Sequence, residues 1–218
     1  MQTDLLKGEP SGLIGIDEAG KGDYFGPLVV AAYYSNSEID EELLKIGLRE
    51  SKKISDSRSF ALEKILKTLA PYDVVAIGPA KYNELYPKFN NLNRLLAWGH
   101  ARALENLLSK TNPRQVVADQ FGNKSLIEKA LMSKAQTVDL HQMHKAESVP
   151  AVAAASVLAR AEFLRRLRGL STEFNMELKK GAGDLVDAAG RKFIKSYGQD
   201  RLIEVAKIHF KNTGKILG

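Results

Sequence analysis

Two adjacent carboxylates follow a short apolar run near the start of the chain. The run from Leu13 to Ile16 is typical of a buried strand, and Asp17 and Glu18 come directly after it. Removing carboxylates from water is costly, so a buried strand carries two such charges only where something compensates them. Clustered carboxylate oxygens are the ligands that a hard divalent cation such as Mg²⁺ requires. Asp17 and Glu18 are therefore candidate metal ligands.

The same stretch allows two other interpretations. Asp17 and Glu18 could simply be solvated residues of a turn at the end of the strand. Residues 15–22 also match the phosphate-loop spacing G-x-x-x-x-G-K-G, but they lack the Ser or Thr that would bind Mg²⁺ and carry carboxylates where phosphate would lie. Because neighbouring strand residues point to opposite faces, both acids can face one site only if the chain bends at Glu18, which Ala19 and Gly20 would permit.

A second apolar run ends in the same way. Residues 115–118 are followed by Asp119, and a glycine turn comes next at Gly122. A single Asp at a strand end is usually a turn former. A metal-ligand role for Asp119 therefore depends on its pairing with the Asp17 site.

Glu147 stands just before a predicted helix. Pro150 is typical of a helix N-terminus, and an alanine-rich segment follows it. A carboxylate at this position complements the helix dipole, or it serves as a fourth metal ligand beside the three acids above. Asp139 is the alternative fourth ligand.

Turn residues and hydrophobic periodicity divide the chain into strands and helices. Further strands are predicted at 28–34, 73–78 and 136–140, the first of them antiparallel to the opening strand. Helices are predicted at 38–46, from Ser55 or Asp56 to about Leu69, at 91–109, at 124–133, from Pro150 onward, at 184–196 and at 200–210. The polar loop 49–58 is either a solvated connection or a cradle for nucleic-acid phosphates.

Composition excludes several classes of protein and partner. The chain of 218 residues has no cysteine, which excludes disulfides and thiolate-bound zinc. We expect a cytoplasmic protein without a membrane partner, because no apolar run could span a bilayer and the N-terminal residues do not resemble a signal peptide. The net charge of +6 favours an anionic partner, with nucleic acid first and a membrane surface second.

The stretch GIDEAGKGDYFGPLVVAA resembles the opening motif of the type 2 and type 3 ribonucleases H, and DYFGPL is most similar to ribonuclease HIII. The resemblance extends from Leu13 to the tail at 210–213. It implies an α/β fold with a ribonuclease H-like mixed five-stranded sheet, flanking helices and additional C-terminal helices. We expect one catalytic domain over 1–218, with a short N-terminal extension at 1–12 and basic helices from about 170 to 218. Ribonuclease HIII proteins usually carry an N-terminal substrate-binding domain, whereas only about a dozen residues precede the first strand here; we expect either the catalytic domain alone or a short variant of the protein.

The resemblance also implies an activity. The expected enzyme is an endoribonuclease that hydrolyses the RNA strand of RNA–DNA hybrids and leaves 3′-hydroxyl and 5′-phosphate ends. Four carboxylates close together would raise each other's pKa unless cations bound. With two Mg²⁺ ions, or Mn²⁺ in their place, one would activate the attacking water and the other would stabilise the leaving oxygen. The expected catalytic and metal-binding residues are Asp17, Glu18, Asp119 and Glu147.

Substrate specificity follows from the same resemblance. Discrimination of RNA from DNA requires contact with the 2′-hydroxyl, and residues 20–22 stand where relatives carry a glycine-flanked ribose-sensing motif. The expected substrate-binding residues are Gly20, Lys21, Gly22, Ser51, Lys52 and Lys53.

Type 2 enzymes use a later tyrosine to recognise an RNA–DNA junction, whereas residues 181–184 here read Gly-Ala-Gly-Asp. This favours a type 3 enzyme, and separately we expect the protein to be a monomer. The alternatives are a type 2 enzyme that cuts at single embedded ribonucleotides, or a non-catalytic nucleic-acid-binding protein.

Overall fold

The computed structural model describes residues 12–48, 54–113, 115–119, 130, 138–143 and 146–218. The predicted helix at 124–133, apart from residue 130, lies outside the described residues. So do residues 1–11 of the expected extension, the beginning of the strand predicted at 136–140, and the polar segment 49–53. In the part of the chain that is described, no helix combines the length and apolarity needed to cross a membrane.

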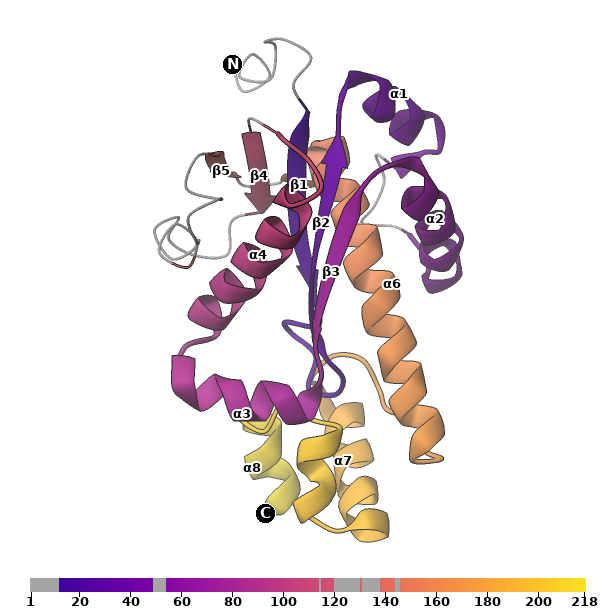
Figure 1. The fold of residues 1–218 in the computed structure, drawn as a ribbon. Coiled ribbons are helices and arrows are strands. Elements are labelled where there is room, and N and C mark those ends of the chain that lie inside the picture. Colours follow the sequence, from indigo (N-terminus) through magenta and orange to yellow (C-terminus); the bar gives the residue numbers. More distant parts are fainter. Residues whose placement is uncertain (1–11, 49–53, 114, 120–129, 131–137, 144–145) are drawn as a thin grey trace.

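A mixed sheet of five strands forms the centre of the molecule, as predicted (Figure 1). In chain order the strands are β1 (Leu13–Ala19), β2 (Leu28–Ser35), β3 (Tyr72–Ile77), β4 (Gln115–Asp119) and β5 (Asp139–Met143), and their spatial order is β3-β2-β1-β4-β5. Strands β1 and β2 are antiparallel, as are β2 and β3, whereas β4 runs parallel to both β1 and β5. The strand predicted to end at Leu140 continues to Met143.

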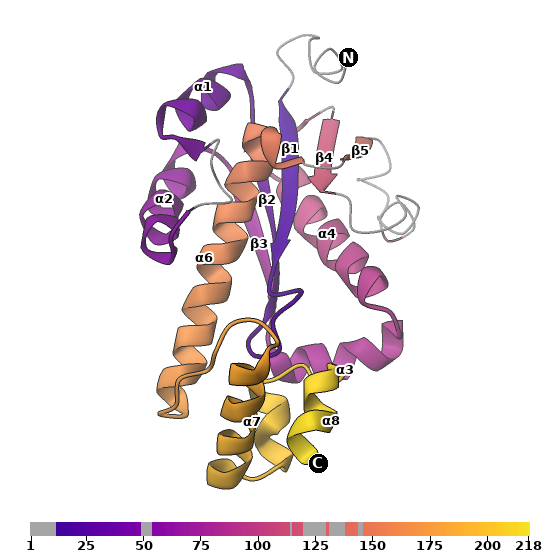
Figure 2. The same ribbon diagram turned by 180° about the vertical axis from the view of Figure 1, so that it is seen from behind.

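Two helices cover opposite faces of the sheet (Figures 1 and 2). Helix α4 (Leu92–Leu108) packs on the face that carries Ile14, Ile16 and Val30. Helix α6 (Pro150–Glu173) packs on the other face, against Val29, Ala31 and Tyr33. The alanine-rich start of α6 lies against β1, since a Cβ atom on Gly15 would stand 2.2 Å from the backbone nitrogen of Val152. This close packing lets α6 pass directly over the end of β1.

Shorter helices complete the layers around this core. They are α1 (Ser37–Lys45), α2 (Asp56–Leu69), α3 (Pro79–Phe89), α7 (Asp184–Tyr197) and α8 (Lys211–Leu217), with the 3-10 turns η4 (Ala146–Ser148) and η5 (Asp200–Glu204). Ser55, not Asp56, caps α2, because its side-chain oxygen accepts a hydrogen bond of 3.2 Å from the Arg58 nitrogen. Helix α3 was not predicted; it begins at Pro79 and contains a second proline, Pro87, which interrupts the usual helical pattern.

The prediction of a helix at 200–210 was wrong. The chain forms η5 instead, then an extended segment around Ala206, and a new helix begins only at Lys211. The extended segment pairs with the turn that follows β1: the Gly26 nitrogen donates to Val205 and the Lys207 nitrogen donates to Tyr24, each at 2.9 Å. These long-range hydrogen bonds take the place of the local ones a helix would make, and they attach the C-terminal helices to the end of β1.

Lys207 lies fully buried within this junction. Its Nζ donates a hydrogen bond of 2.8 Å to the Gly26 carbonyl oxygen and lies 5.8 Å and 5.9 Å from the ring centres of Tyr82 and Phe210. Burial lowers the pKa of Lys207 from 10.5 to about 7, against a smaller opposing effect from the charge of Asp23. Burial in this junction therefore favours the neutral amine of Lys207 over its charged form, more than exposure to water would.

We expect the wild-type free energy of unfolding to rise with pH between about 7 and 10, relative to that of a Lys207→Met variant. In this range the unfolded chain keeps a proton on Lys207 that the folded protein has lost, so raising the pH favours the folded state. Urea denaturation at pH 7 and pH 9.5 measures the difference. Lys211→Met, at an exposed lysine of α8, is the matched control. Parallel pH profiles for wild type and Lys207→Met would contradict this assignment.

Candidate active site

Three of the four predicted acidic residues line one pocket. Asp17, Asp119 and Glu147 share a pocket of about 210 Å³ with Ser156 and Arg160. Strands β1 and β4 are parallel, and Ile16 pairs with Ala118, so the next residues, Asp17 and Asp119, lie side by side at the same edge of the sheet. Glu147 reaches this edge from η4, just before α6. The fold therefore gathers acids that are far apart in the sequence.

Asp17 is held by hydrogen bonds and is largely withdrawn from water. Its Oδ1 accepts a hydrogen bond of 2.8 Å from the Glu18 nitrogen, and its carboxylate also interacts with the Ser156 hydroxyl. Burial raises the pKa of Asp17 to about 7, and the negative charges of Glu18 and, to a smaller degree, Asp119 add to the effect. A proton or a cation in this pocket therefore relieves an unfavourable charge.

Glu18 lies on the other side of the strand. Strand β1 stays paired with β2 through Ala19, so the bend considered at Glu18 does not occur and the turn begins at Gly20, where φ is +84°. The Glu18 carboxylate meets His100 of α4, with Nε2 3.1 Å from Oε2, while Oε1 lies 3.5 Å from Lys21 Nζ. Burial favours the protonated acid, but the hydrogen bond and charge of His100, with Lys21, hold the pKa of Glu18 below its usual value.

The pocket lined by Glu18 nevertheless adjoins the pocket that holds Asp17. Glu18 lines a second pocket, of about 420 Å³, together with Asp23 and Lys180. Ser156 and Arg160 line both this pocket and the one that holds Asp17. The pair of acids therefore straddles the end of β1, with one member in each of two adjoining pockets.

Asp139, the alternative fourth ligand, is far from this edge. It begins β5 opposite Gln115, whereas Asp119 lies opposite Met143 at the other end of the same strand pair. Four residues of strand separate the two positions by about 13 Å. Asp139 is exposed and lies 3.0 Å from His141. Glu147, not Asp139, therefore shares the pocket with the other acids.

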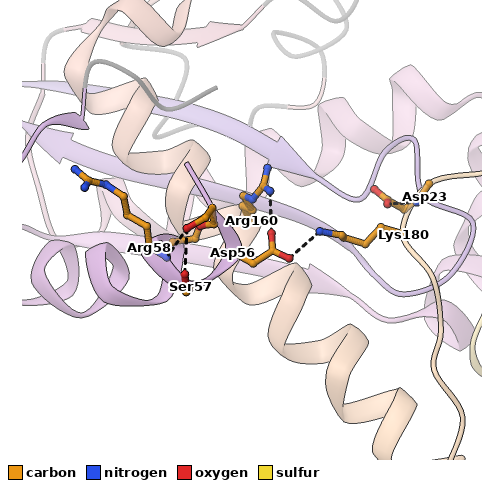
Figure 3. Close-up of polar contacts among 9 residues, drawn as sticks. Asp23, Asp56, Ser57, Arg58, Arg160 and Lys180 are labelled. Carbon is orange, nitrogen blue, oxygen red and sulfur yellow. Dashed lines mark hydrogen bonds and ion pairs between the residues drawn. The ribbon is translucent and has the colours of Figure 1, made fainter. Parts of the chain in front are cut away.

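A polar network ties together the segments around the pockets (Figure 3). Asp56, at the start of α2, accepts hydrogen bonds from Arg160 Nη2 at 2.9 Å and from Lys180 Nζ at 2.7 Å. The next residue, Gly181, donates its backbone N–H to Asp23 Oδ1 at 2.6 Å. Helix α2, helix α6 and the loop before α7 are thereby joined to the turn after β1.

The predicted substrate-binding residues differ in their surroundings. Gly20 is buried in the turn, where a Cβ atom would stand 2.1 Å from the Pro27 carbonyl oxygen. Gly22 faces open space, with no atom within 4 Å of where its Cβ would be. Lys21 between them lies beside Glu18. Ser51, Lys52 and Lys53 lie outside the described residues.

The acidic pocket suits a hard divalent cation. Among the described residues, no three acidic, histidine or cysteine side chains already stand close enough together to hold an ion as a group. Mg²⁺ does not need such a cage, because it retains several waters and binds through one or two carboxylates together with substrate phosphates. The pocket supplies carboxylate oxygens, and burial makes their uncompensated charge unfavourable. The residues present therefore fit the ion.

Sequence reasoning missed His100. It occupies the buried stripe of α4, four residues after Leu96 and four before Leu104. A histidine in an otherwise apolar stripe is a signal that a polar partner lies on the opposing element, because a buried polar group without one is costly. The sequence does not say which element supplies the partner.

Comparisons with known proteins agree with the fold. The profile of the family described as ribonuclease HII matches residues 14–213. The ribonuclease HIII of Protochlamydia amoebophila is 43% identical over 94% of this chain and 68% of its own length, and that of Chlamydia pneumoniae is 42% identical over 93% and 69%. The crystal structure of Bst-RNase HIII in complex with Mn²⁺ matches with a TM-score of 0.89 at 32% identity, over 95% of this chain and 70% of that one.

We expect Asp17→Asn to raise the free energy of unfolding at pH 8 without divalent cations, by on the order of 1 kcal/mol or more. The pKa of Asp17 rises from 3.8 to about 7 on folding. Between these two pH values the folded protein holds a proton that the unfolded chain has lost, so wild-type stability falls as the pH rises from about 4 to 7 and stays low at pH 8. Urea denaturation with a chelator, at pH 5 and pH 8, measures the effect.

Asp139→Asn is the matched control for that experiment, since its carboxylate is exposed and distant from the pocket. It should leave the pH profile unchanged. A lower stability of Asp17→Asn at pH 8, or equal shifts in both variants, would contradict the assigned burial of charge.

Proposed function

Because this chain belongs to the ribonuclease HII family, whose members are metal-dependent endoribonucleases, we propose that it hydrolyses the RNA strand of RNA–DNA hybrids. The observation that carries this proposal is the shared pocket of Asp17, Asp119 and Glu147, with Glu18 in the adjoining pocket. A pure nucleic-acid binder gains nothing from buried acids, which repel phosphate. A nuclease needs them to hold cations.

Four acidic residues are proposed to hold two Mg²⁺ or Mn²⁺ ions: Asp17, Glu18, Asp119 and Glu147. Bound there, the ions would supply positive charge for in-line attack of water on a phosphodiester, with 3′-hydroxyl and 5′-phosphate products. Ser156 fixes the orientation of the Asp17 carboxylate, and the backbone N–H of Glu18 supports the same group. Asp17 is central in this assignment because it feels the charges of both Glu18 and Asp119.

Cationic side chains beside the acids are suited to the nucleic-acid backbone. Arg160 lines both pockets, and its Nε is buried without a hydrogen-bond partner among the described residues. Lys180 lines the Glu18 pocket and is half exposed. Both are paired with Asp56, so a substrate phosphate would compete with that carboxylate for them. These positive charges reduce the repulsion between a phosphate and the acidic site.

We further propose type 3 specificity. The loop at 181–184 is held against the turn after β1 through Gly181 and Asp23, and it carries no aromatic side chain. An aromatic residue there would suit stacking at an RNA–DNA junction, whereas small residues leave recognition to the backbone around Gly22. The working unit is proposed to be a cytoplasmic monomer with one catalytic domain, of which the basic C-terminal helices from about residue 170 are part.

A cleavage assay on two duplexes tests the function. With Mg²⁺, we expect efficient cutting of a continuous RNA–DNA hybrid and poor cutting of a DNA duplex that holds one ribonucleotide, with 5′-phosphate products. Asp17→Asn and Asp119→Asn should abolish cleavage, whereas Asp139→Asn should cut at the wild-type rate.

The other outcomes of this assay each identify an alternative. Equal cutting of both duplexes would indicate a type 2 enzyme. Salt-sensitive binding of the hybrid with no Mg²⁺-dependent product would indicate a non-catalytic binding protein. Activity retained by Asp17→Asn would refute the assigned site.

Gly22 offers a separate test of substrate contact. Because an added methyl group meets only open space in the free protein, we expect Gly22→Ala to unfold at the wild-type temperature and to bind Mn²⁺ normally. If the bare backbone approaches the ribose, the same methyl group should raise KM for the hybrid about tenfold, or about 1.4 kcal/mol. Gly169→Ala, also in open space, is the control. An unchanged KM for Gly22→Ala would show that the hybrid does not approach this residue.

A further inference from the structure

His100 is a buried polar residue next to an assigned metal ligand. It lies on the sheet-facing side of α4, its side chain is fully buried, and Ala97, Ala101 and Leu104 of the same helix belong to the apolar cluster there. Its Nε2 is 3.1 Å from Glu18 Oε2, which places the imidazole within hydrogen-bond distance of one carboxylate oxygen.

The two oxygens of Glu18 have different surroundings. Oε2 meets His100 in the protein interior, and Oε1 lies 3.5 Å from the partly exposed ammonium of Lys21. Glu18 side-chain exposure is 11%, so the side chain is not completely withdrawn from solvent, and Glu18 is among the residues that line the pocket of about 420 Å³. One oxygen is thus engaged by the core, and the other is already next to a positive charge.

We propose that His100 is a positioning residue for the metal site: it holds Oε2 of Glu18 and so presents Oε1 to a divalent cation. This inference rests on the proposed function, in which Glu18 is a ligand. A long carboxylate side chain without such a contact loses rotational freedom when it binds an ion, and the hydrogen bond from a buried helix removes that freedom in advance. In the free protein Lys21 supplies the neutralising positive charge beside Oε1, and a bound divalent cation would take over that role.

The competing explanation is that the His100–Glu18 contact merely attaches α4 to β1. A purely structural contact would change stability without changing how the folded protein binds an ion. The distinguishing readout is therefore the Mn²⁺ affinity of the full chain in the absence of substrate, measured by titration calorimetry.

We expect His100→Ala to weaken Mn²⁺ binding by about ten- to a hundredfold, the usual effect of removing a group that orients a metal ligand. His100→Gln, which retains a side-chain N–H donor, should recover most of the affinity. In a Glu18→Gln background, adding His100→Ala should cause little further loss, because the histidine acts through Glu18. The Mg²⁺ concentration for half-maximal cleavage should rise in His100→Ala, with recovery of the rate at high Mg²⁺.

Leu104→Ala is the matched control, since it opens a cavity on the same buried face of α4 without touching a carboxylate. It should lower stability and leave Mn²⁺ affinity unchanged. Wild-type affinity in a folded His100→Ala, or no recovery with His100→Gln, would overturn the inference while the proposed function stood. Failure of the wild type to bind Mn²⁺ or to cut the hybrid would overturn both.

Discussion

The repulsion between acids gathered at one edge of the sheet is the constraint on which the rest of the site depends. Parallel pairing of β1 and β4 brings Asp17 and Asp119 to the same edge, and the tight passage of α6 over Gly15 partly buries them. Burial and neighbouring charges then raise the pKa of Asp17 to about 7. Keeping these carboxylates together lowers the stability of the free protein. Such a cost is expected at a functional site where a bound ligand relieves the repulsion.

Elements with strong local signals could be predicted from the sequence. The apolar runs that precede Asp17 and Asp119 are β1 and β4, and Pro150 with the alanine-rich segment that follows it begins α6. The opening motif added what no local pattern contains, namely that these strand ends belong to one site. The resemblance of the segment around Glu147 to the family was the basis for preferring Glu147 over Asp139, a choice with which the register of β4 and β5 agrees.

Features that depend on distant partners could not be predicted. The segment at 200–210 has helix-forming residues, but its backbone pairs with the turn at Tyr24 and Gly26, over 170 residues away in sequence. The opposite orientations of Asp17 and Glu18 follow from the β1–β2 ladder continuing to Ala19, which a local pattern does not specify. For the same reason, the partner of His100 is defined only by the packing of α4 against β1.

The most direct test of the account is the number of protons released when the full chain binds Mn²⁺, from calorimetry in buffers of different ionisation enthalpy. Since Asp17 carries a proton below about pH 7, binding at pH 6.5 should release most of one proton, and release should approach zero by pH 8.5. Binding of Mn²⁺ at pH 6.5 without proton release, or no binding at all, would contradict a site in which cations relieve the repulsion between buried carboxylates.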